Sequence, residues 1–200
     1  MASKRFALPN GAYTQWHAEW RINRGRWGLD TGLVRGCLQL LEETNTRSIV
    51  ELGAGIGHYV AMFRGYGFKS EGFDGIPDIF KLSRGLVRYH DLCEPLPYWQ
   101  EIPWYDWCLS SEVGEHIPPG HTDAYVKNVV GSCKRGAIIS WAHRRQRGSL
   151  HVNCRDESEV IELFEAAGLK FDADWTKKMR EVVHEKGLKS RISVFMKEKV

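Results

Sequence analysis

Apolar residues first recur at helical spacing and then give way to short β-favouring runs. Leu33, Cys37, Leu40 and Leu41 follow the capping stretch "GLDTG" and predict a helix. A strand is expected at 47–52, and "HYVAMFRGYGF" after it predicts a helix of about two turns that ends at a glycine. The chain is therefore expected to begin its core as helix, strand, helix.

The same alternation continues toward the C-terminus. "FKSEGFD" predicts a second strand, "IPDIFKLSRG" a short helix and "LVRYHDL" a third strand. "YDWCLSSEV", "TDAYVKNVVGSC" and "GAIISWA" predict strand, helix and strand, and "DESEVIELFEAAG" predicts an amphipathic helix with an acidic first turn. Two late strands are expected around "KFDADW" and "SRISVFMKE". This spacing favours an α/β fold in which a doubly wound, mostly parallel sheet carries helices on both faces.

Length and composition indicate one globular domain. The chain has 200 residues, of which 42% are hydrophobic, and its net charge of +3 is too small to indicate a nucleic-acid partner. Trp16, His17, Trp20 and Trp27 give the N-terminal stretch an aromatic character. We therefore expect an N-terminal helical and aromatic cap at 1–46 on a core at 47–200.

The cysteines and the apolar runs indicate the cellular compartment of the protein. The five cysteines are scattered and form no C-x-x-C pair, so neither a zinc site nor a disulfide framework is indicated. No apolar stretch approaches the ~20 residues that cross a bilayer, and "MASKRFALPN" has no apolar segment behind its basic residues. We expect an intracellular, cytoplasmic protein without a membrane partner.

The stretch "ELGAGIGHY" carries the strongest chemical signal. Gly53, Gly55 and Gly57 fall at the turn after the first strand, where residues without a Cβ let the backbone approach a ligand. A Walker loop is absent, and the third glycine comes one residue too early for a dinucleotide fingerprint. Glu51 would repel a pyrophosphate and would suit a ligand with a sulfonium and an ammonium group.

Three motifs follow one another in order: E-x-G-x-G-x-G after the first strand, an acid at the end of the second and an Asp-Leu pair after the third. Together they resemble class I S-adenosylmethionine-dependent methyltransferases of the small-molecule type. "SSEVGEHIPPG" and "ELFEAAGLKF" resemble the fourth-strand segment and the late helix of that family. The resemblance covers 47–200 and implies seven strands with the last one antiparallel, S-adenosylmethionine as cofactor and S-adenosylhomocysteine as product.

The resemblance also implies a cofactor site. The methionine part would be surrounded by Glu51, Gly53, Ala54, Gly55 and Gly57. Asp74 would accept hydrogen bonds from both ribose hydroxyls. The adenine would lie between Gly75 and Ile76 on one side and Asp91 and Leu92 on the other, with Asp91 facing the exocyclic amine. Ser110, Ser111 and Glu112 would border the methyl group. A structural alternative for Asp91 is to cap the next turn, and Glu112 could instead brace the end of the sheet.

Methyl transfer from a sulfonium requires alignment and the exclusion of water, and no metal. His116 and Glu112 are the candidate catalytic residues, since an unperturbed histidine titrates near ~6.5 and suits a general base. In its structural alternative, His116 bonds a backbone carbonyl and shapes the loop before the prolines. His58 is expected to be at most a peripheral contact.

The acceptor site is expected between the aromatic cap and the loop "SWAHRRQRGSLHVNC". The candidate substrate-binding residues are Trp16, His17, Trp20, Trp27, His143, His151 and Asn153. The arginines of this loop could bind an anion or form a solvated face.

The sequence favours a methyltransferase that acts on a small molecule. Two alternatives stay open: a methyltransferase for RNA or protein, and a non-catalytic cofactor-binding subunit that activates a partner. A dinucleotide oxidoreductase ranks with the second alternative. The acceptor and the oligomeric state are not determined by the sequence.

Overall fold

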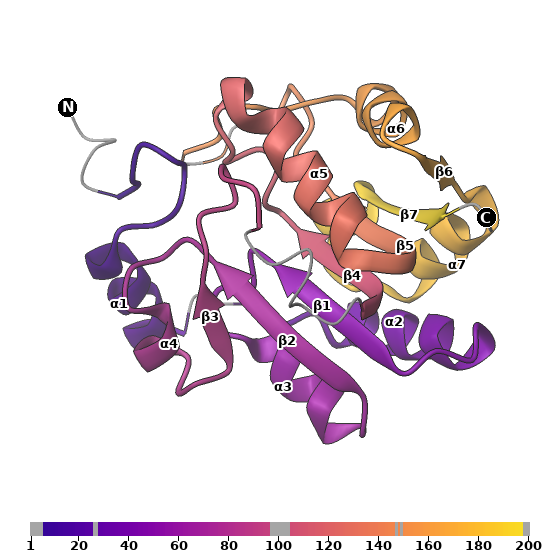
Figure 1. The fold of residues 1–200 in the computed structure, drawn as a ribbon, viewed down its shortest axis with the longest axis horizontal. Coiled ribbons are helices and arrows are strands. Elements are labelled where there is room, and N and C mark those ends of the chain that lie inside the picture. The colour runs from indigo at the N-terminus through magenta and orange to yellow at the C-terminus, as the bar shows by residue number, and fades with distance from the viewer. Residues whose placement is uncertain (1–5, 26–27, 97–104, 147, 149, 198–200) are drawn as a thin grey trace.

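The computed structural model describes residues 6–25, 28–96, 105–146, 148 and 150–197, and these form a sheet covered by helices (Figure 1). The strands are β1 (Ser48–Leu52), β2 (Lys69–Asp74), β3 (Val87–Tyr89), β4 (Tyr105–Ser111), β5 (Cys133–Ser140), β6 (Leu169–Phe171) and β7 (Ile192–Lys197). Their order is β3-β2-β1-β4-β5-β7-β6. The first five run parallel, whereas β7 is antiparallel to β5 and β6. The predicted α/β fold with an antiparallel last strand is confirmed.

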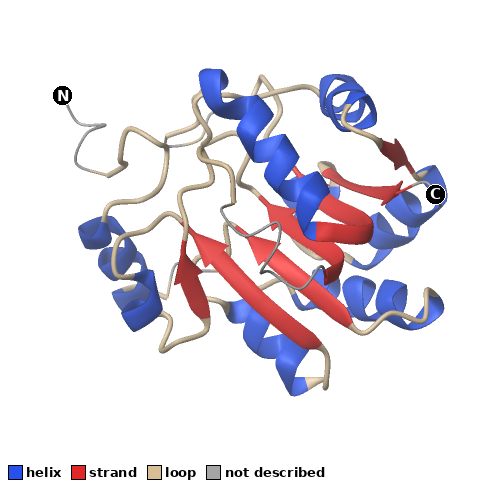
Figure 2. Ribbon diagram, viewed as in Figure 1, coloured by secondary structure: helices blue, strands red, loops and turns tan. Residues whose placement is uncertain are grey.

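Helices lie on both sides of the sheet (Figure 2). They are α1 (Gln15–Asn23), α2 (Thr31–Glu43), α3 (His58–Gly65), α4 (Ile79–Leu82), α5 (Thr122–Ser132), α6 (Glu157–Ala166), α7 (Ala173–Val182) and α8 (Lys186–Lys189), with a 3₁₀ turn at Pro119–His121. None of the helices within the described ranges is long and apolar enough to cross a membrane.

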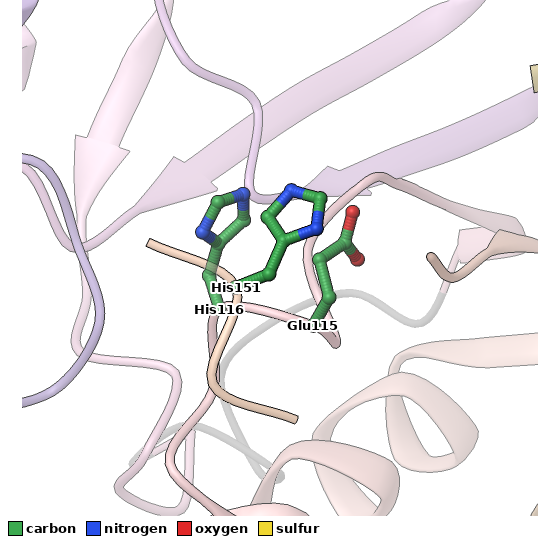
Figure 3. A group of neighbouring side chains, drawn as sticks. All are labelled: Glu115, His116 and His151. Carbon is green, nitrogen blue, oxygen red and sulfur yellow. The ribbon is translucent and has the colours of Figure 1, made fainter. Parts of the chain in front are cut away.

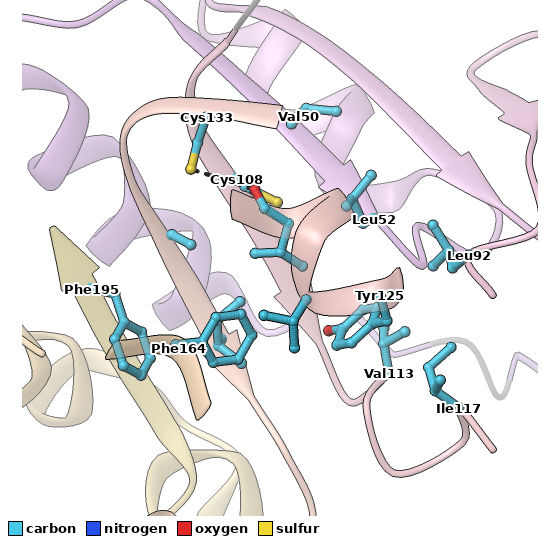
Figure 4. Packing of buried hydrophobic residues seen from close by; sticks show 14 of the residues in the cluster. Val50, Leu52, Leu92, Cys108, Val113, Ile117, Tyr125, Cys133, Phe164 and Phe195 are labelled. Atoms are coloured by element: carbon cyan, nitrogen blue, oxygen red, sulfur yellow. Dashed lines mark hydrogen bonds between the residues drawn. The ribbon is translucent and has the colours of Figure 1, made fainter. Parts of the chain in front are cut away.

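Two apolar clusters hold the helices on the sheet because alternate strand residues point to opposite faces. Trp107 of β4 joins the cluster that contains residues of α2 and α7. The next residue, Cys108, points to the opposite face and joins the cluster with Tyr125 of α5 and Phe164 of α6, shown in Figure 4. All five cysteines are free thiols, and four of them are buried.

The segment after β6 corrects one prediction. A late strand was expected around "KFDADW"; β6 is that strand, but it ends at Phe171 and α7 begins at Ala173. The side chain of Asp172 accepts a hydrogen bond from the amide of Trp175 at 2.8 Å and so caps the helix. Thr176 and Met179 of α7 are buried, and the whole helix is missing from the sequence prediction. Its N-cap aspartate outweighed the β-favouring residues beside it.

The loop after β3 depends on one buried amide side chain of α5. Asn128 accepts a hydrogen bond from the amide of Leu96 at 2.8 Å and donates to the carbonyls of Leu92 and Glu94 at 3.1 and 2.8 Å. Since Asn128 is 0% exposed, alanine there would take away the side-chain partner of the Leu96 amide and of the Leu92 carbonyl, both on buried residues, and one of the partners of the Glu94 carbonyl. We expect Asn128→Ala to lower the free energy of unfolding by about 2–4 kcal/mol in urea titrations.

The exposed neighbour Lys127 provides the control for this substitution. Lys127→Ala should leave the urea midpoint nearly unchanged, because it removes no buried hydrogen bond. Equal midpoints for Asn128→Ala and Lys127→Ala would show that the three bonds do not stabilise the loop.

Candidate functional site

A cavity of about 730 Å³ opens at the carboxyl ends of the parallel strands. Its walls include Glu51 of β1, Asp74 of β2 and Ser111 of β4, together with parts of the N-terminal segment and of the region around 184–188. The strand order reverses between β1 and β4, and ligands of open α/β sheets bind at that switch point. The cavity is therefore the candidate active site.

The glycine loop forms one wall of the cavity in a conformation that requires glycine. Gly53 has φ of 79°, and a Cβ built on it would come within 2.2 Å of a Val113 methyl carbon. The amides of Gly53 and Ala54 both donate to the carbonyl of Phe73, at 2.8 and 3.1 Å, which ties the loop to β2. The backbone thus faces the cavity without side chains in the way.

Asp74 joins the loop to the end of β2. Its two carboxylate oxygens accept hydrogen bonds from the amides of Gly55 at 2.8 Å and Ile76 at 3.0 Å. Burial raises the pKa of Asp74 from 3.8 to about 6, although these amides act in the opposite direction. The carboxylate is half-buried on the cavity wall, so its remaining lone pairs are open to a ligand with hydroxyl groups.

Glu51 is a second acid in the same wall. It is 4% exposed, and its Oε2 has no hydrogen-bond partner within the described part of the chain. Burial, and then the nearby charge of Asp74, raise the pKa of Glu51 well above its ordinary value. A cationic ligand in the cavity would favour the ionised form and offset this cost.

Most of the predicted cofactor residues line this cavity. They are Glu51, Gly53, Ala54, Gly55, Asp74, Gly75, Ile76, Leu92 and Ser111. Gly57 lies outside the lining and precedes α3 with φ of 81°. Ser110 is buried and donates to the carbonyl of Leu52 at 2.8 Å, while Asp91 accepts from the amide of Cys93 at 2.9 Å. Asp91 therefore makes the turn-capping contact, and its adenine role stays a prediction.

The two predicted catalytic residues both border the cavity. Glu112 forms an ion pair with Arg191 at 2.7 Å and accepts from the Ser140 hydroxyl at 2.9 Å. His116 places Nδ1 3.2 Å from the carbonyl oxygen of Leu150. Burial, and then the neighbouring His151, lower the pKa of His116 to about 4. The imidazole is thus a weaker base than the unperturbed value led us to expect.

The predicted substrate-binding residues separate into several groups. His151 lines the cavity, whereas Trp16, His17, Trp20, His143 and Asn153 do not. His17 stacks on Trp20 at a centroid distance of 5.6 Å, and Trp27 lies outside the described residues. Asn153 is buried and donates to the Thr122 hydroxyl at 3.0 Å, and exposed Arg144 pairs with half-buried Glu159.

Several cavity residues were missed by sequence reasoning. Tyr13 comes from the N-terminal segment, His184 and Glu185 precede α8, and Glu115 lies within the quoted stretch "SSEVGEHIPPG". Burial, and then the charge of Glu112, raise the pKa of Glu115. The spacing of Glu112, Glu115 and His116 was a signal that could have identified it; nothing local marked the other three.

Several solved structures with a similar fold are methyltransferases. Magnesium protoporphyrin IX methyltransferase from Synechocystis PCC 6803, with bound SAH, aligns with a TM-score of 0.61 at 14% identity over 82% of each chain. A TehB-like SAM-dependent methyltransferase from Corynebacterium glutamicum gives 0.62 at 15% identity over 92% of this chain and 96% of its own.

A third similar structure holds both a product and an acceptor. The 1,6-didemethyltoxoflavin-N1-methyltransferase of Burkholderia thailandensis, with bound 1,6-didemethyltoxoflavin and S-adenosylhomocysteine, gives 0.59 at 16% identity over 92% of this chain and 86% of its own. No protein-family profile and no curated protein sequence matches this chain. The similarity to these structures shows that the chain has the fold of class I SAM-dependent methyltransferases.

Proposed function

We propose that this protein transfers a methyl group from S-adenosylmethionine to a small-molecule acceptor. One observation carries the proposal: Glu51, the glycine loop and Asp74 line a single cavity at the switch point of a sheet with the methyltransferase fold. Asp74 has lone pairs for ribose hydroxyls, and Glu51, whose Oε2 has no partner among the described residues, suits a ligand with cationic groups.

The small-molecule class is supported by the walls of the cavity. Residues 10–13 of the N-terminal segment and His151 form part of its wall, so an acceptor bound there would have protein on several sides. Such a site limits the access of water and can align the acceptor with the methyl group, which is what an in-line displacement needs. Arg144 of the basic loop is paired with Glu159, which weakens the case for that loop as an RNA-binding surface.

Calorimetric titration of the purified chain tests the cofactor. S-adenosylmethionine and S-adenosylhomocysteine should bind with micromolar dissociation constants. NAD should give no heat of binding, because the glycine loop lacks the G-x-G-x-x-G spacing of a dinucleotide site. Binding of NAD without either sulfur ligand would contradict the proposal. If the sulfur ligands bind, a screen of metabolites with methyl-labelled cofactor would identify the acceptor; transfer to RNA or protein alone would contradict the small-molecule class.

A further inference from the structure

Three side chains with metal-binding atoms converge at the wall of the cavity. Glu115 and His116 follow β4, and His151 comes from the loop after β5. Each offers one ligand atom, and these atoms lie within 4.8 Å of one another (Figure 3). We propose that Glu115, His116 and His151 bind a divalent transition-metal ion. Sequence reasoning expected no metal here, so the inference departs from that expectation.

The carboxylate of Glu115 lacks the partners that a buried charge requires. The residue is 0% exposed, and neither side-chain oxygen has a hydrogen-bond partner among the described residues. Glu112, three residues earlier, is held by Arg191 and the Ser140 hydroxyl. A buried carboxylate without a partner is costly, and a bound cation would remove that cost. Of these two acids, Glu115 is therefore the one whose carboxylate is available to a metal ion.

The imidazoles are held in positions that suit ligation. Nδ1 of His116 lies 3.2 Å from the Leu150 carbonyl oxygen, so it can donate there and leave Nε2 for a metal. Leu150 has φ of 72°, a conformation costly for leucine, which the surrounding structure imposes. The rings of His116 and His151 meet edge to face, with centroids 4.9 Å apart.

Backbone hydrogen bonds bring the two loops together before any ion binds. The carbonyl of Glu115 accepts from the amides of Val152 and Asn153 at 2.8 and 3.0 Å. Asn153 is fixed in turn, since its carbonyl accepts from the indole nitrogen of Trp141 at 2.5 Å. His151 is therefore held against the Glu115–His116 pair by bonds that do not involve the ligand atoms.

The donor set indicates the class of metal. Two imidazoles and one carboxylate suit manganese, iron, cobalt or zinc better than magnesium or calcium, which prefer oxygen ligands. Three protein ligands leave coordination positions open, and all three residues line the cavity.

If the protein performs the proposed methyl transfer, the open coordination positions of the metal would bind an acceptor through a hydroxyl oxygen. The metal would lower the pKa of that hydroxyl, whose proton passes to solvent. An oxygen lone pair then forms the bond to the methyl carbon while the carbon–sulfur bond breaks. Its electron pair stays on sulfur and gives the neutral thioether. This step rests on the proposed function, whereas metal binding itself does not.

Cobalt(II) is the probe for the test because its visible absorption reports the ligand environment. The full chain, stripped of metal with a chelator, should bind one Co²⁺ and develop visible bands. Glu115→Gln and His151→Ala should each weaken Co²⁺ binding about tenfold or more. His143→Ala, a histidine outside the cavity lining, should bind Co²⁺ like the wild type. At the same Co²⁺ concentration, the unfolding temperature of the wild type should rise more than that of Glu115→Gln.

Two results would overturn the site: no Co²⁺ binding at millimolar metal, or equal affinity in the wild type and in folded Glu115→Gln and His151→Ala. Thermal unfolding of each metal-free variant establishes that it is folded. Titration of S-adenosylmethionine into the same samples separates the two proposals. Cofactor binding without Co²⁺ binding would contradict only the proposed metal site. Co²⁺ binding without cofactor binding would contradict only the proposed methyltransferase function.

Discussion

Asp74→Asn is expected to lose about 100-fold in affinity for S-adenosylmethionine. The carboxylate already accepts hydrogen bonds from the amides of Gly55 and Ile76, and two ribose hydroxyls would use its remaining lone pairs. Asparagine has a single acceptor oxygen and an amide that donates, so it cannot serve all four groups. Losing hydrogen bonds to a charged group worth about 3 kcal/mol in total corresponds to that factor. Calorimetry measures it directly.

The pH dependence of cofactor binding gives the same residue a second readout. The pKa of Asp74 is raised from 3.8 to about 6, so the folded apoprotein keeps a proton that the unfolded chain releases between these values. Its ionisation thus costs stability as pH rises through this window. A ligand that needs the carboxylate must expel that proton. Wild-type affinity should fall about tenfold per pH unit below pH 6 through Asp74 alone. Asp74→Asn should lose this part of the dependence and keep only the part that comes from Glu51, whose pKa is also raised.

Asp174→Asn is the matched control, since Asp174 is exposed on α7 and does not line the cavity. It should bind S-adenosylmethionine like the wild type at every pH. An Asp74→Asn protein with wild-type affinity would show that the ribose is held elsewhere.

Gly53→Ala is expected to destabilise the protein and to lower its affinity for the cofactor. At φ of 79° an alanine is strained by about 1–2 kcal/mol. Its Cβ would also lie 2.2 Å from a Val113 methyl carbon, which adds an overpacking cost of about 1–3 kcal/mol. Urea titrations should therefore show a loss of about 2–5 kcal/mol in the free energy of unfolding. The displaced loop should bind S-adenosylmethionine at least tenfold more weakly.

Two further variants separate the backbone strain from the overlap with Val113. Gly65→Ala, in the last turn of α3 with nothing within 4 Å of the added Cβ, should be neutral or slightly stabilising. Adding Val113→Ala to Gly53→Ala should relieve the overlap and leave the backbone strain. Unchanged stability in Gly53→Ala would show that the loop adapts without cost.

Local patterns predicted most of the sheet and the glycine loop, because both depend on residues close together in the chain. The strand that ends at Leu52 and the helix that starts at His58 have bounds close to those expected from sequence. The failure at α7 is also local: Asp172 acts as an N-cap within a stretch that otherwise favours a strand. The cap and the burial of Thr176 and Met179 together favour the helix.

The features of the site that depend on contacts between residues far apart in the sequence were harder to predict. The low pKa of His116 follows from burial and from His151, which is distant in sequence. Asn153 was expected to face a substrate, yet its amide bonds Thr122 across the fold. Tyr13 and His184 line the same cavity because their segments pack on residues far away in the sequence, Tyr13 on His116 and His184 on Asp30, and no sequence motif marks such contacts.

The N-terminal segment has a consequence for how the protein is made. Gly11 packs so tightly that a Cβ would lie 1.9 Å from the carbonyl oxygen of His116, and the carbonyl of Asn10 accepts from the thiol of Cys93 at 3.3 Å. Residues 10–13 leave the ribosome long before the residues they cover. Their contacts can form only after the sheet has formed, so this wall of the cavity is completed late in folding. A nascent chain can thus assemble its central strands while the cavity is still open to solvent.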